Sequence, residues 1–334
     1  MPQEEVAIQD IMDTFSYKRT LDREAVNRWA VSEVLLTDFY PLDREKWVVG
    51  AQLPSSHIYY GDHVARSETY DLLMVLEACR QAATYGGYIQ FGNPLETVNI
   101  ANYFEIKMSS REFIPLRSQP AEIAIRVVTT DVIEKGGRVR GTTPVMEIFR
   151  NGRKLGDATI RASFVTPDQF HALRVRQRGS EPPKTTRLAD APLAELDFAS
   201  TVGRNNPVNV VISHARIEDN DAVAELALSG RNRSLLDHEY DHVPAMALIE
   251  AARQLGLLLL QAPSGDGPGC AVDRLKAVSV AASFDRFAEV DGPTILKAHR
   301  LNEKTDSDTA FVETEFIQAG NSLTRVKVGY AYSN

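Results

Sequence analysis

The sequence contains one long apolar stretch twice, and this duplication limits the folds available to the chain. Residues 245–260 are apolar or small except for three polar side chains, and residues 72–88, about half a chain earlier, repeat the pattern. The polar side chains are Glu77, Arg80 and Gln81 in the first copy and Glu250, Arg253 and Gln254 in the second. On a helix each set forms one stripe, and a helix that is otherwise apolar all round belongs in a core. We therefore expect two related units, each built on a buried helix.

The segments after each apolar stretch alternate in polarity and are rich in β-branched and aromatic residues, a pattern typical of strands. The predicted strands are 34–36, 47–49, 98–106, 121–129, 138–149 and 154–165 in the first half and 208–212, 223–229, 275–284, 294–301, 310–317 and 323–331 in the second. Hairpin turns are expected at Asn151-Gly152 and Gly320-Asn321, and the first helix is expected to end at Gly86-Gly87. One buried helix followed by an antiparallel meander predicts an α+β unit whose sheet wraps the helix.

The domain boundaries are predicted at the positions where the alternating pattern of polar and apolar residues stops. A chain of 334 residues suggests about two domains. We predict an N-terminal extension over 1–30, a first unit over 31–165, a linker over 166–200 and a second unit over 201–334. The linker is rich in Pro, Ser and Arg and lacks periodicity. Its arginines at 174, 176 and 178 are able to meet a phosphate, but we expect a solvated linker face.

Composition excludes several classes of protein. A formal net charge of −8 argues against binding to nucleic acid or to anionic membranes, and no apolar run reaches the roughly 18 residues of a membrane span. The first residues are acidic and lack the regions of a secretion signal, which predicts a cytoplasmic protein. Two cysteines provide neither a disulfide framework nor zinc-site spacing, so we expect no metal and no cofactor.

Two motifs are more specific than the fold pattern. AQLPSSHIYY with the downstream LEACRQ, and DHVPAMALIEAARQ in the second half, resemble the A-factor biosynthesis (AfsA-like) hotdog family of actinobacterial butyrolactone synthases. The similarity runs through about residues 30–165 and 200–332. It implies a double hotdog fold, in which two antiparallel sheets each wrap a long central helix. The chain departs from the family pattern at Tyr70-Asp71-Leu72, where His-Asp-Pro is expected, and at Ala245, where glycine is usual.

The resemblance also implies a reaction. Such proteins are acyltransferases that join a β-ketoacyl group, carried as a thioester on acyl carrier protein or coenzyme A, to the hydroxyl of dihydroxyacetone phosphate. The ester closes to a butenolide phosphate, a precursor of butyrolactone or furan-type signalling molecules. Two rival hypotheses stay open, namely hydrolysis or dehydration of acyl thioesters on the same fold and a non-catalytic acyl-binding regulatory role. The acyl chain, the carrier, the oligomeric state and the choice of catalytic helix also stay open.

Acyl transfer to an alcohol needs a proton acceptor, a stabilised oxyanion and two substrates held together. Burial can raise the pKa of a carboxyl toward the working range, so Glu77 and Glu250 are candidate bases, with Glu77 preferred. Arg253 is the predicted anion-binding group. The remaining predicted substrate-binding side chains are Arg80, Gln81 and Gln254. The N-termini of the two helices offer amide groups for an oxyanion or a phosphate.

Other residues allow further interpretations. His242 precedes the second helix and is a candidate catalytic residue, although a hydrogen-bonded loop histidine is an equally ordinary role. The carboxylates and histidines of 237–242 invite a metal site, which Pro244 disfavours because the residue before a proline avoids helical geometry. Cys79 lies between Glu77 and Arg80, but its counterpart is an alanine, which favours packing over an acyl-cysteine. Each Glu-Arg pair can also serve simply to neutralise buried charge, with Gln completing the network.

Overall fold

The computed structural model describes residues 8–64, 69–109, 114–218, 220–263, 269–303 and 309–332, and these fall into two compact units. Unit 1 comprises Met1–Ser55 and Thr69–Phe170, and unit 2 comprises Ser56–Glu68 and His171–Asn334. The loop at residues 56–64 therefore belongs to unit 2, although it lies in the chain between elements of unit 1. This differs from the continuous first unit that the sequence predicted.

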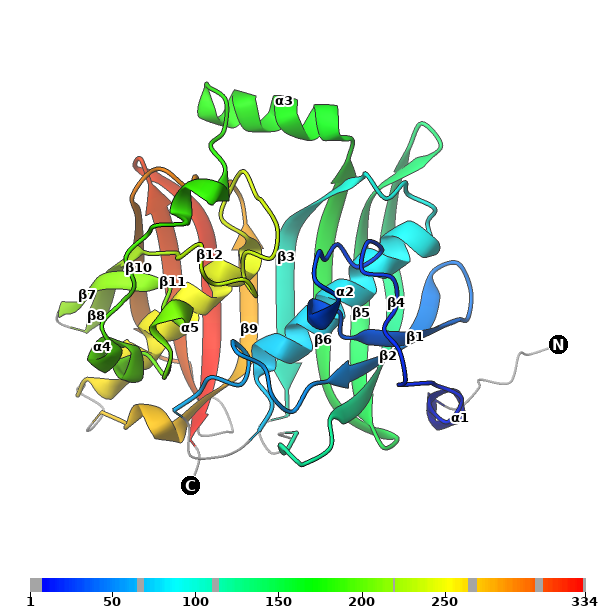
Figure 1. Ribbon diagram of the computed structural model, residues 1–334, viewed down its shortest axis with the longest axis horizontal. Coiled ribbons are helices and arrows are strands. Elements are labelled where there is room, and N and C mark those ends of the chain that lie inside the picture. Colours follow the sequence, from blue (N-terminus) through cyan, green and yellow to red (C-terminus); the bar gives the residue numbers. More distant parts are fainter. Residues whose placement is uncertain are drawn as a thin grey trace. The chain divides into compact units, whose positions relative to one another are not determined.

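Unit 1 is a curved antiparallel sheet around one long helix (Figure 1). Its main elements are α1 (Ile8–Met12), β1 (Leu36–Pro41), β2 (Lys46–Leu53), α2 (Leu72–Ile89), β3 (Val98–Met108), β4 (Ala121–Lys135), β5 (Arg138–Arg150) and β6 (Arg153–Val165). The strands follow the order β1-β2-β4-β5-β6-β3, and α2 contacts all six. The apolar periphery of α2 is buried because the sheet curls around it, as the sequence predicted.

Unit 2 repeats this architecture strand for strand. Its main elements are β7 (Ile212–Glu218), β8 (Asp221–Leu226), α5 (Ala245–Gln261), β9 (Leu275–Phe284), β10 (Thr294–Leu301), β11 (Thr309–Gln318) and β12 (Asn321–Tyr332). The order β7-β8-β10-β11-β12-β9 corresponds to that of unit 1, and α5 contacts all six strands. Both units are thus α+β hotdog units, which confirms the predicted fold.

The first long helix does not end at its glycine pair, and that prediction was wrong. Helix α2 continues through Gly86 and Gly87 to Ile89. A Cβ on Gly86 would lie 2.2 Å from the indole of Trp47, a fully buried side chain of β2. Glycine here allows the helix to approach the sheet closely, and close packing rather than chain termination explains its presence. In α5 the corresponding close approach is made at Gly256, where a Cβ would lie 2.2 Å from the Tyr330 hydroxyl of β12.

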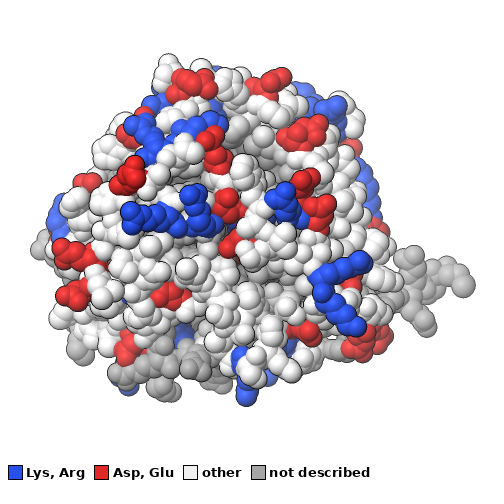
Figure 2. Space-filling model, viewed as in Figure 1, with Lys and Arg blue, Asp and Glu red and all other residues white. Residues whose placement is uncertain are grey.

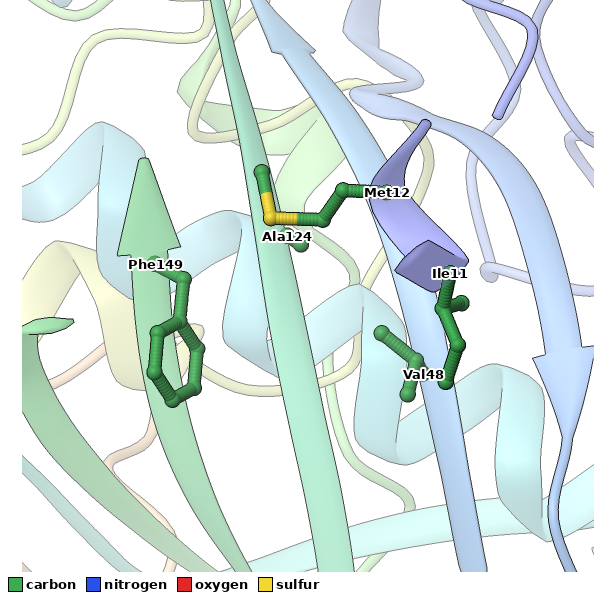
Figure 3. Packing of buried hydrophobic residues seen from close by; sticks show 5 residues of the cluster. All are labelled: Ile11, Met12, Val48, Ala124 and Phe149. Carbon is green, nitrogen blue, oxygen red and sulfur yellow. The ribbon is translucent and has the colours of Figure 1, made fainter. Parts of the chain in front are cut away.

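A second apolar cluster covers the outer side of unit 1 at one place (Figure 3). Ile11 and Met12 of α1 pack with Val48 of β2, Ala124 of β4 and Phe149 of β5. Because successive strand residues point to opposite faces, Trp47 packs against α2 while its neighbour Val48 packs under α1. This two-sided covering explains why nearly every residue of β2 is buried.

The predicted hairpins occur, one of them displaced by a residue. Asn151 and Gly152 join β5 to β6, and both have positive φ, as a two-residue primed turn requires. In unit 2 the positive-φ pair is Ala319 and Gly320, with Asn321 already paired to Gln318.

Two predictions of local structure were wrong. Residues 207–209 form a 3₁₀ turn, η3 (Pro207–Asn209), where a strand was expected, because Asn206 caps the turn by accepting a hydrogen bond from the Val208 amide. The predicted linker contains the helices α3 (Pro167–Arg178) and α4 (Leu196–Thr201) and the 3₁₀ turn η2 (Thr185–Leu188). Within α3, Arg174 is fully buried rather than solvated.

Basic and acidic side chains are mixed over the face shown in Figure 2. Within the described residues, no helix is both long and apolar enough to cross a bilayer.

Candidate active site

The polar stripe of α2 lies in a buried network that a residue of the predicted N-terminal extension completes. Arg28 contacts the Glu77 carboxylate through Nε and Nη2, at 3.0 and 2.6 Å from Oε1. Arg80 grips the same carboxylate with two donors, each at 2.8 Å. Gln81 donates to Glu77 Oε1 at 2.7 Å. One carboxylate is therefore shared by two guanidinium groups inside the core of unit 1.

This environment overturns the predicted pKa of Glu77. Burial does oppose ionisation, but the charges of Arg28 and Arg80 outweigh it and hold the pKa of the Glu77 carboxyl at about 2, below the usual 4.5. The prediction of a raised pKa was wrong because it considered desolvation without the second arginine. A carboxylate held this way has little affinity for a proton at neutral pH, which makes it a poor general base.

The polar stripe of α5 lies in a matching network in unit 2. Arg204 contacts Glu250 Oε1 through Nε and Nη2 at 2.9 and 2.8 Å, and Arg253 Nη2 lies 2.5 Å from Oε2. Gln254 donates to Oε1 at 2.6 Å. Tyr59, from the loop at residues 56–64, donates its hydroxyl to Oε2 at 3.2 Å. The Glu250 side chain is thus buried and surrounded by donors, as that of Glu77 is.

Each glutamine fastens a turn to its helix. Gln81 accepts from the Leu35 amide at 2.9 Å and donates to the Glu33 carbonyl at 2.7 Å. Gln254 accepts from the Val211 amide at 3.0 Å and donates to the Asn209 carbonyl at 2.8 Å. Glu33 ends the 3₁₀ turn η1 (Val31–Glu33), and Asn209 ends η3. The amide groups of both glutamines therefore have protein partners, and their predicted role in substrate binding stays a prediction.

Sequence reasoning missed Arg28 and Arg204, the two outer arginines of these networks. Both lie far from the helices in the sequence, one in the predicted extension and one just after the predicted linker. A weak signal was present, since each arginine precedes an apolar pair, Val34-Leu35 or Val210-Val211, by the same spacing. Only the fold shows that this spacing places both arginines against a buried glutamate.

The two helix-borne arginines differ in exposure. The side chain of Arg80 is 17% exposed and also contacts the Val26 carbonyl and the Thr84 hydroxyl. The side chain of Arg253 is 7% exposed, and the Tyr330 hydroxyl donates to its backbone carbonyl at 2.9 Å. The predicted role of Arg253 in anion binding is not tested by these contacts.

The two helices begin differently. At the start of α2, Asp71 caps the helix, and its carboxylate accepts from the Leu73 amide at 2.9 Å. At the start of α5 the capping position is Pro244, which provides no side-chain acceptor. A negative charge occupies the electropositive end of α2, whereas the first turn of α5 has no side-chain cap. Of the two starts, that of α5 is the better suited to a developing oxyanion.

His242 lies just before this uncapped start. Its Nδ1 is 2.5 Å from Asp241 Oδ1, and its ring packs edge-on against Phe287 at 4.9 Å between centroids. Burial opposes ionisation of Asp241, but the hydrogen bond and the charge of His242, followed by the charges of Arg174 and Lys184, hold the pKa of the Asp241 carboxyl below its usual value. A carboxylate beside Nδ1 favours the tautomer with the proton on that atom, which makes Nε2 the basic nitrogen of the neutral ring. The side chain is 24% exposed.

The remaining candidates have packing or loop roles. His238 pairs with Asp237 at 2.6 Å and stacks on Tyr240. Among the described residues, no group of three or more His, Cys, Asp or Glu side chains is placed to hold a metal. Cys79 is fully buried, and burial raises the pKa of its thiol, so it packs rather than forming a thiolate. His57 accepts from the Tyr59 and Tyr60 amides and so shapes the loop that delivers Tyr59.

Solved structures share this fold. A protein named as an oleoyl thioesterase, from Lactobacillus plantarum, superposes with a TM-score of 0.51 at 10% identity, covering 89% of this chain and 96% of that one. The dehydratase domain from the CurJ module of curacin polyketide synthase gives a TM-score of 0.50 at 10% identity, covering 90% and 96%. At this identity the likeness shows the fold alone.

Sequence relatives are more informative. A protein from Streptomyces virginiae named 2-oxo-3-(phosphooxy)propyl 3-oxoalkanoate synthase is 27% identical over 293 residues, which cover 86% of this chain and 90% of that protein. A protein of the same name from Streptomyces coelicolor is 25% identical over 308 residues, 89% of this chain and 88% of its own. The family model of the A-factor biosynthesis hotdog domain matches residues 12–166 and 188–330, one match for most of each half. The chain belongs to the A-factor biosynthesis hotdog family.

Proposed function

We propose that the protein is an acyltransferase that joins a β-ketoacyl group to the hydroxyl of dihydroxyacetone phosphate. The observation that carries this proposal is the similarity, over most of both units, to proteins named 2-oxo-3-(phosphooxy)propyl 3-oxoalkanoate synthase. That name describes an ester whose acid is a 3-oxoalkanoate and whose alcohol is dihydroxyacetone phosphate. A thioester on acyl carrier protein or coenzyme A is the proposed acyl donor.

The proposed base is His242. The hydroxyl oxygen of dihydroxyacetone phosphate attacks the thioester carbonyl carbon while its proton passes to His242 Nε2. The C–O bond forms, the C–S bond breaks as the tetrahedral intermediate collapses, and the proton passes on to the leaving thiolate. Support comes from the Asp241–His242 hydrogen bond and from the nearby start of α5. We propose that amides in the first turn of that helix stabilise the oxyanion.

The buried glutamates have a different proposed role. Glu77 and Glu250 neutralise the arginines that tie the segment before each sheet to its helix. We therefore assign neither glutamate to proton transfer, in contrast to the sequence-based preference for Glu77. Arg253 keeps its predicted role as the group that binds the phosphate. Replacing it by glutamine tests this role, because loss of a phosphate partner raises the KM for dihydroxyacetone phosphate without changing that for the thioester.

One assay separates this function from its rivals. Purified protein is incubated with a β-ketoacyl thioester, with and without dihydroxyacetone phosphate, while free thiol and ester are measured. The proposal predicts release of thiol and formation of the phosphorylated ester only when both substrates are present. Thiol release that is indifferent to dihydroxyacetone phosphate indicates a hydrolase instead. Binding of the thioester without turnover under either condition indicates a non-catalytic acyl-binding protein.

A further inference from the structure

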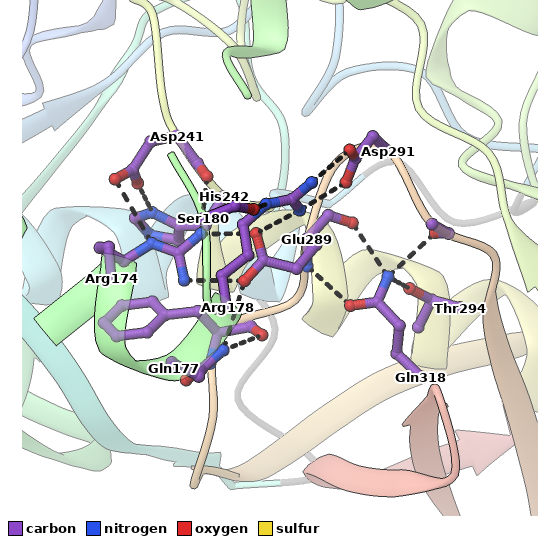
Figure 4. A network of polar contacts seen from close by, with 12 residues as sticks. Arg174, Gln177, Arg178, Ser180, Asp241, His242, Glu289, Asp291, Thr294 and Gln318 are labelled. Atoms are coloured by element: carbon purple, nitrogen blue, oxygen red, sulfur yellow. Dashed lines mark hydrogen bonds and ion pairs between the residues drawn. The ribbon is translucent and has the colours of Figure 1, made fainter. Parts of the chain in front are cut away.

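Helix α3 carries the most completely buried cation outside the two helix networks. Arg174 is fully buried, and its guanidinium reaches two acidic side chains on separate loops of unit 2 (Figure 4). It lies 3.3 Å from Asp241 Oδ2 through Nε, and it donates to Glu289 through Nη1 and Nη2 at 2.9 and 2.8 Å. Nη2 also donates to the Asp241 backbone carbonyl at 2.8 Å. A buried guanidinium requires acidic partners of this kind. That requirement does not explain why the partners of Arg174 lie next to His242.

The contacts of Arg174 converge on two neighbours of the His242 ring. One neighbour is Asp241, which binds His242 Nδ1 through the carboxylate oxygen that Arg174 does not contact. The other is Phe287, whose ring packs against His242 and lies 4.6 Å from the Arg174 guanidinium carbon. Gln177, one turn further along α3, binds both the amide and the carbonyl of Phe287, at 3.1 and 3.0 Å. Arg174 and Gln177 thus fasten the hydrogen-bonding partner and the packing partner of one imidazole.

We infer that Arg174 is a positioning residue for His242, acting through Asp241 and Phe287. The inference rests on the proposed function only in taking His242 as the base. The guanidinium holds Asp241 in place through its carboxylate and its backbone carbonyl, so that the carboxylate holds the proton of the imidazole on Nδ1 and the ring presents Nε2 as the base. A segment that the sequence predicted to be a solvated linker is in this account part of the catalytic apparatus.

The charged surroundings of His242 provide matched controls. Titratable groups on the elements packed around it include Asp237, His238, Glu239, Tyr240 and Asp241 in its own loop, Arg174 and Arg178 in α3, Arg286, Glu289 and Asp291 in the loop before β10, and Lys184 before η2. Arg178 binds Glu289 and Asp291 in this network (Figure 4). Arg176, on the same helix, is exposed. Arg176→Gln therefore removes the same charge from α3 without touching the network.

The test uses the full chain with 15N-labelled histidine. The ring nitrogen shifts of His242, assigned by comparison with His242→Asn, report which nitrogen carries the proton and how the ring titrates. In Arg174→Gln and in Asp241→Asn we expect the shifts to leave the Nδ1-protonated pattern, whereas Arg176→Gln should match the wild type. The same two variants should lower kcat about 10- to 100-fold with little change in KM and should alter the pH profile of kcat.

Two outcomes overturn the inference. Folded Arg174→Gln protein whose His242 ring keeps wild-type shifts and titration shows that Arg174 does not position the ring. If Arg174→Gln does not fold, Asp241→Asn decides instead, because an unchanged ring in that variant removes the link through which Arg174 acts. Failure of the proposed function looks different, since the wild type then makes no ester while the ring shifts still respond to Arg174→Gln.

Discussion

The buried networks of the two units share the same Glu, Arg and Gln contacts but differ in the residues around them. Both place a helix glutamate between two arginines and use a helix glutamine to clamp a 3₁₀ turn. Unit 2 adds Tyr59, whose hydroxyl reaches Glu250 and whose ring lies 4.5 Å from the Arg204 guanidinium carbon. Unit 1 leaves Arg80 partly exposed. The features that both units share serve the common fold. A function that belongs to one unit has to depend on the features in which the units differ.

The helix starts show the clearest difference. Asp71 caps α2 with a carboxylate, whereas Pro244 leaves α5 without a side-chain cap and His242 lies two residues earlier. Both units bury charge in the same way, but of the two helix starts only that of α5 combines a missing side-chain cap with a nearby imidazole. This difference is the reason why the proposed chemistry is placed at the start of α5 rather than on the polar stripes of the helices.

The largest expected effect comes from removing an outer arginine. Arg28→Met or Arg204→Met removes two close donor contacts from a buried glutamate, and each hydrogen bond to a charged group contributes about 1.5–3 kcal/mol. Urea unfolding measures both losses, with the exposed Arg44→Met as the control. Negligible losses would show that the two networks do not stabilise the units as described.

Acid should weaken the unit 1 network in a defined range. Glu77 has a pKa of about 2 in the folded protein and 4.5 as its ordinary value, so an unfolded chain takes up the proton first as the pH falls. The stabilisation is fully present above pH 4.5 and is lost as the pH falls toward 2. The difference in unfolding free energy between wild type and Glu77→Gln should therefore shrink over that range. A difference that stays constant down to pH 2 would contradict the depressed pKa.

Replacing a helix glycine by alanine should cost more stability where the side chain that the new Cβ meets is more rigidly held. Gly86→Ala drives a Cβ into the buried Trp47 ring, and overpacking of this kind costs about 1–3 kcal/mol. Gly256→Ala meets the Tyr330 hydroxyl, so Tyr330→Phe should recover part of its loss. Gly87→Ala is the control on α2, since its Cβ would lie 3.3 Å from Phe164. Thermal unfolding of the four variants is the measurement, and an equal effect of Gly86→Ala and Gly87→Ala would be inconsistent with the packing described.

The smallest effects on stability are expected at the helix starts. Removing the cap of α2 should destabilise the protein, whereas adding a cap to α5 should stabilise it. Asp71→Ala removes a cap and should cost about 1 kcal/mol, whereas Pro244→Asp adds one and should stabilise α5 slightly. In the proposed mechanism Pro244→Asp should nevertheless lower kcat by at least about tenfold, because its carboxylate competes with the oxyanion. Pro244→Ser, a neutral cap, controls for charge. Unchanged kcat in Pro244→Asp would remove α5 from the oxyanion site.

The sequence predicted the two helices and most of the strands. The spacing of apolar residues and the content of β-branched residues show directly which segments are buried and in which type of element. It could not predict that Gly86 faces Trp47, because that contact joins elements far apart in the chain. The same limit hid Arg28 and Arg204, and so misled the expectation for the pKa of Glu77. The loop carrying Tyr59 was noticed for its aromatic and histidine content, but its assignment to unit 2 depends on tertiary contacts. His242 was a candidate from sequence, whereas the contact of its partner Asp241 with a helix within the predicted linker depends on tertiary structure.

The central claim is that proton transfer belongs to His242 and charge neutralisation to the helix glutamates. It is tested most directly by measuring kcat for ester formation, per mole of folded protein at low temperature, in His242→Asn and Glu77→Gln. The account predicts a loss of about 10²- to 10⁴-fold in His242→Asn with normal stability. It predicts a kcat near that of the wild type in Glu77→Gln despite reduced stability. A folded Glu77→Gln protein without activity, beside an active His242→Asn protein, would contradict the account.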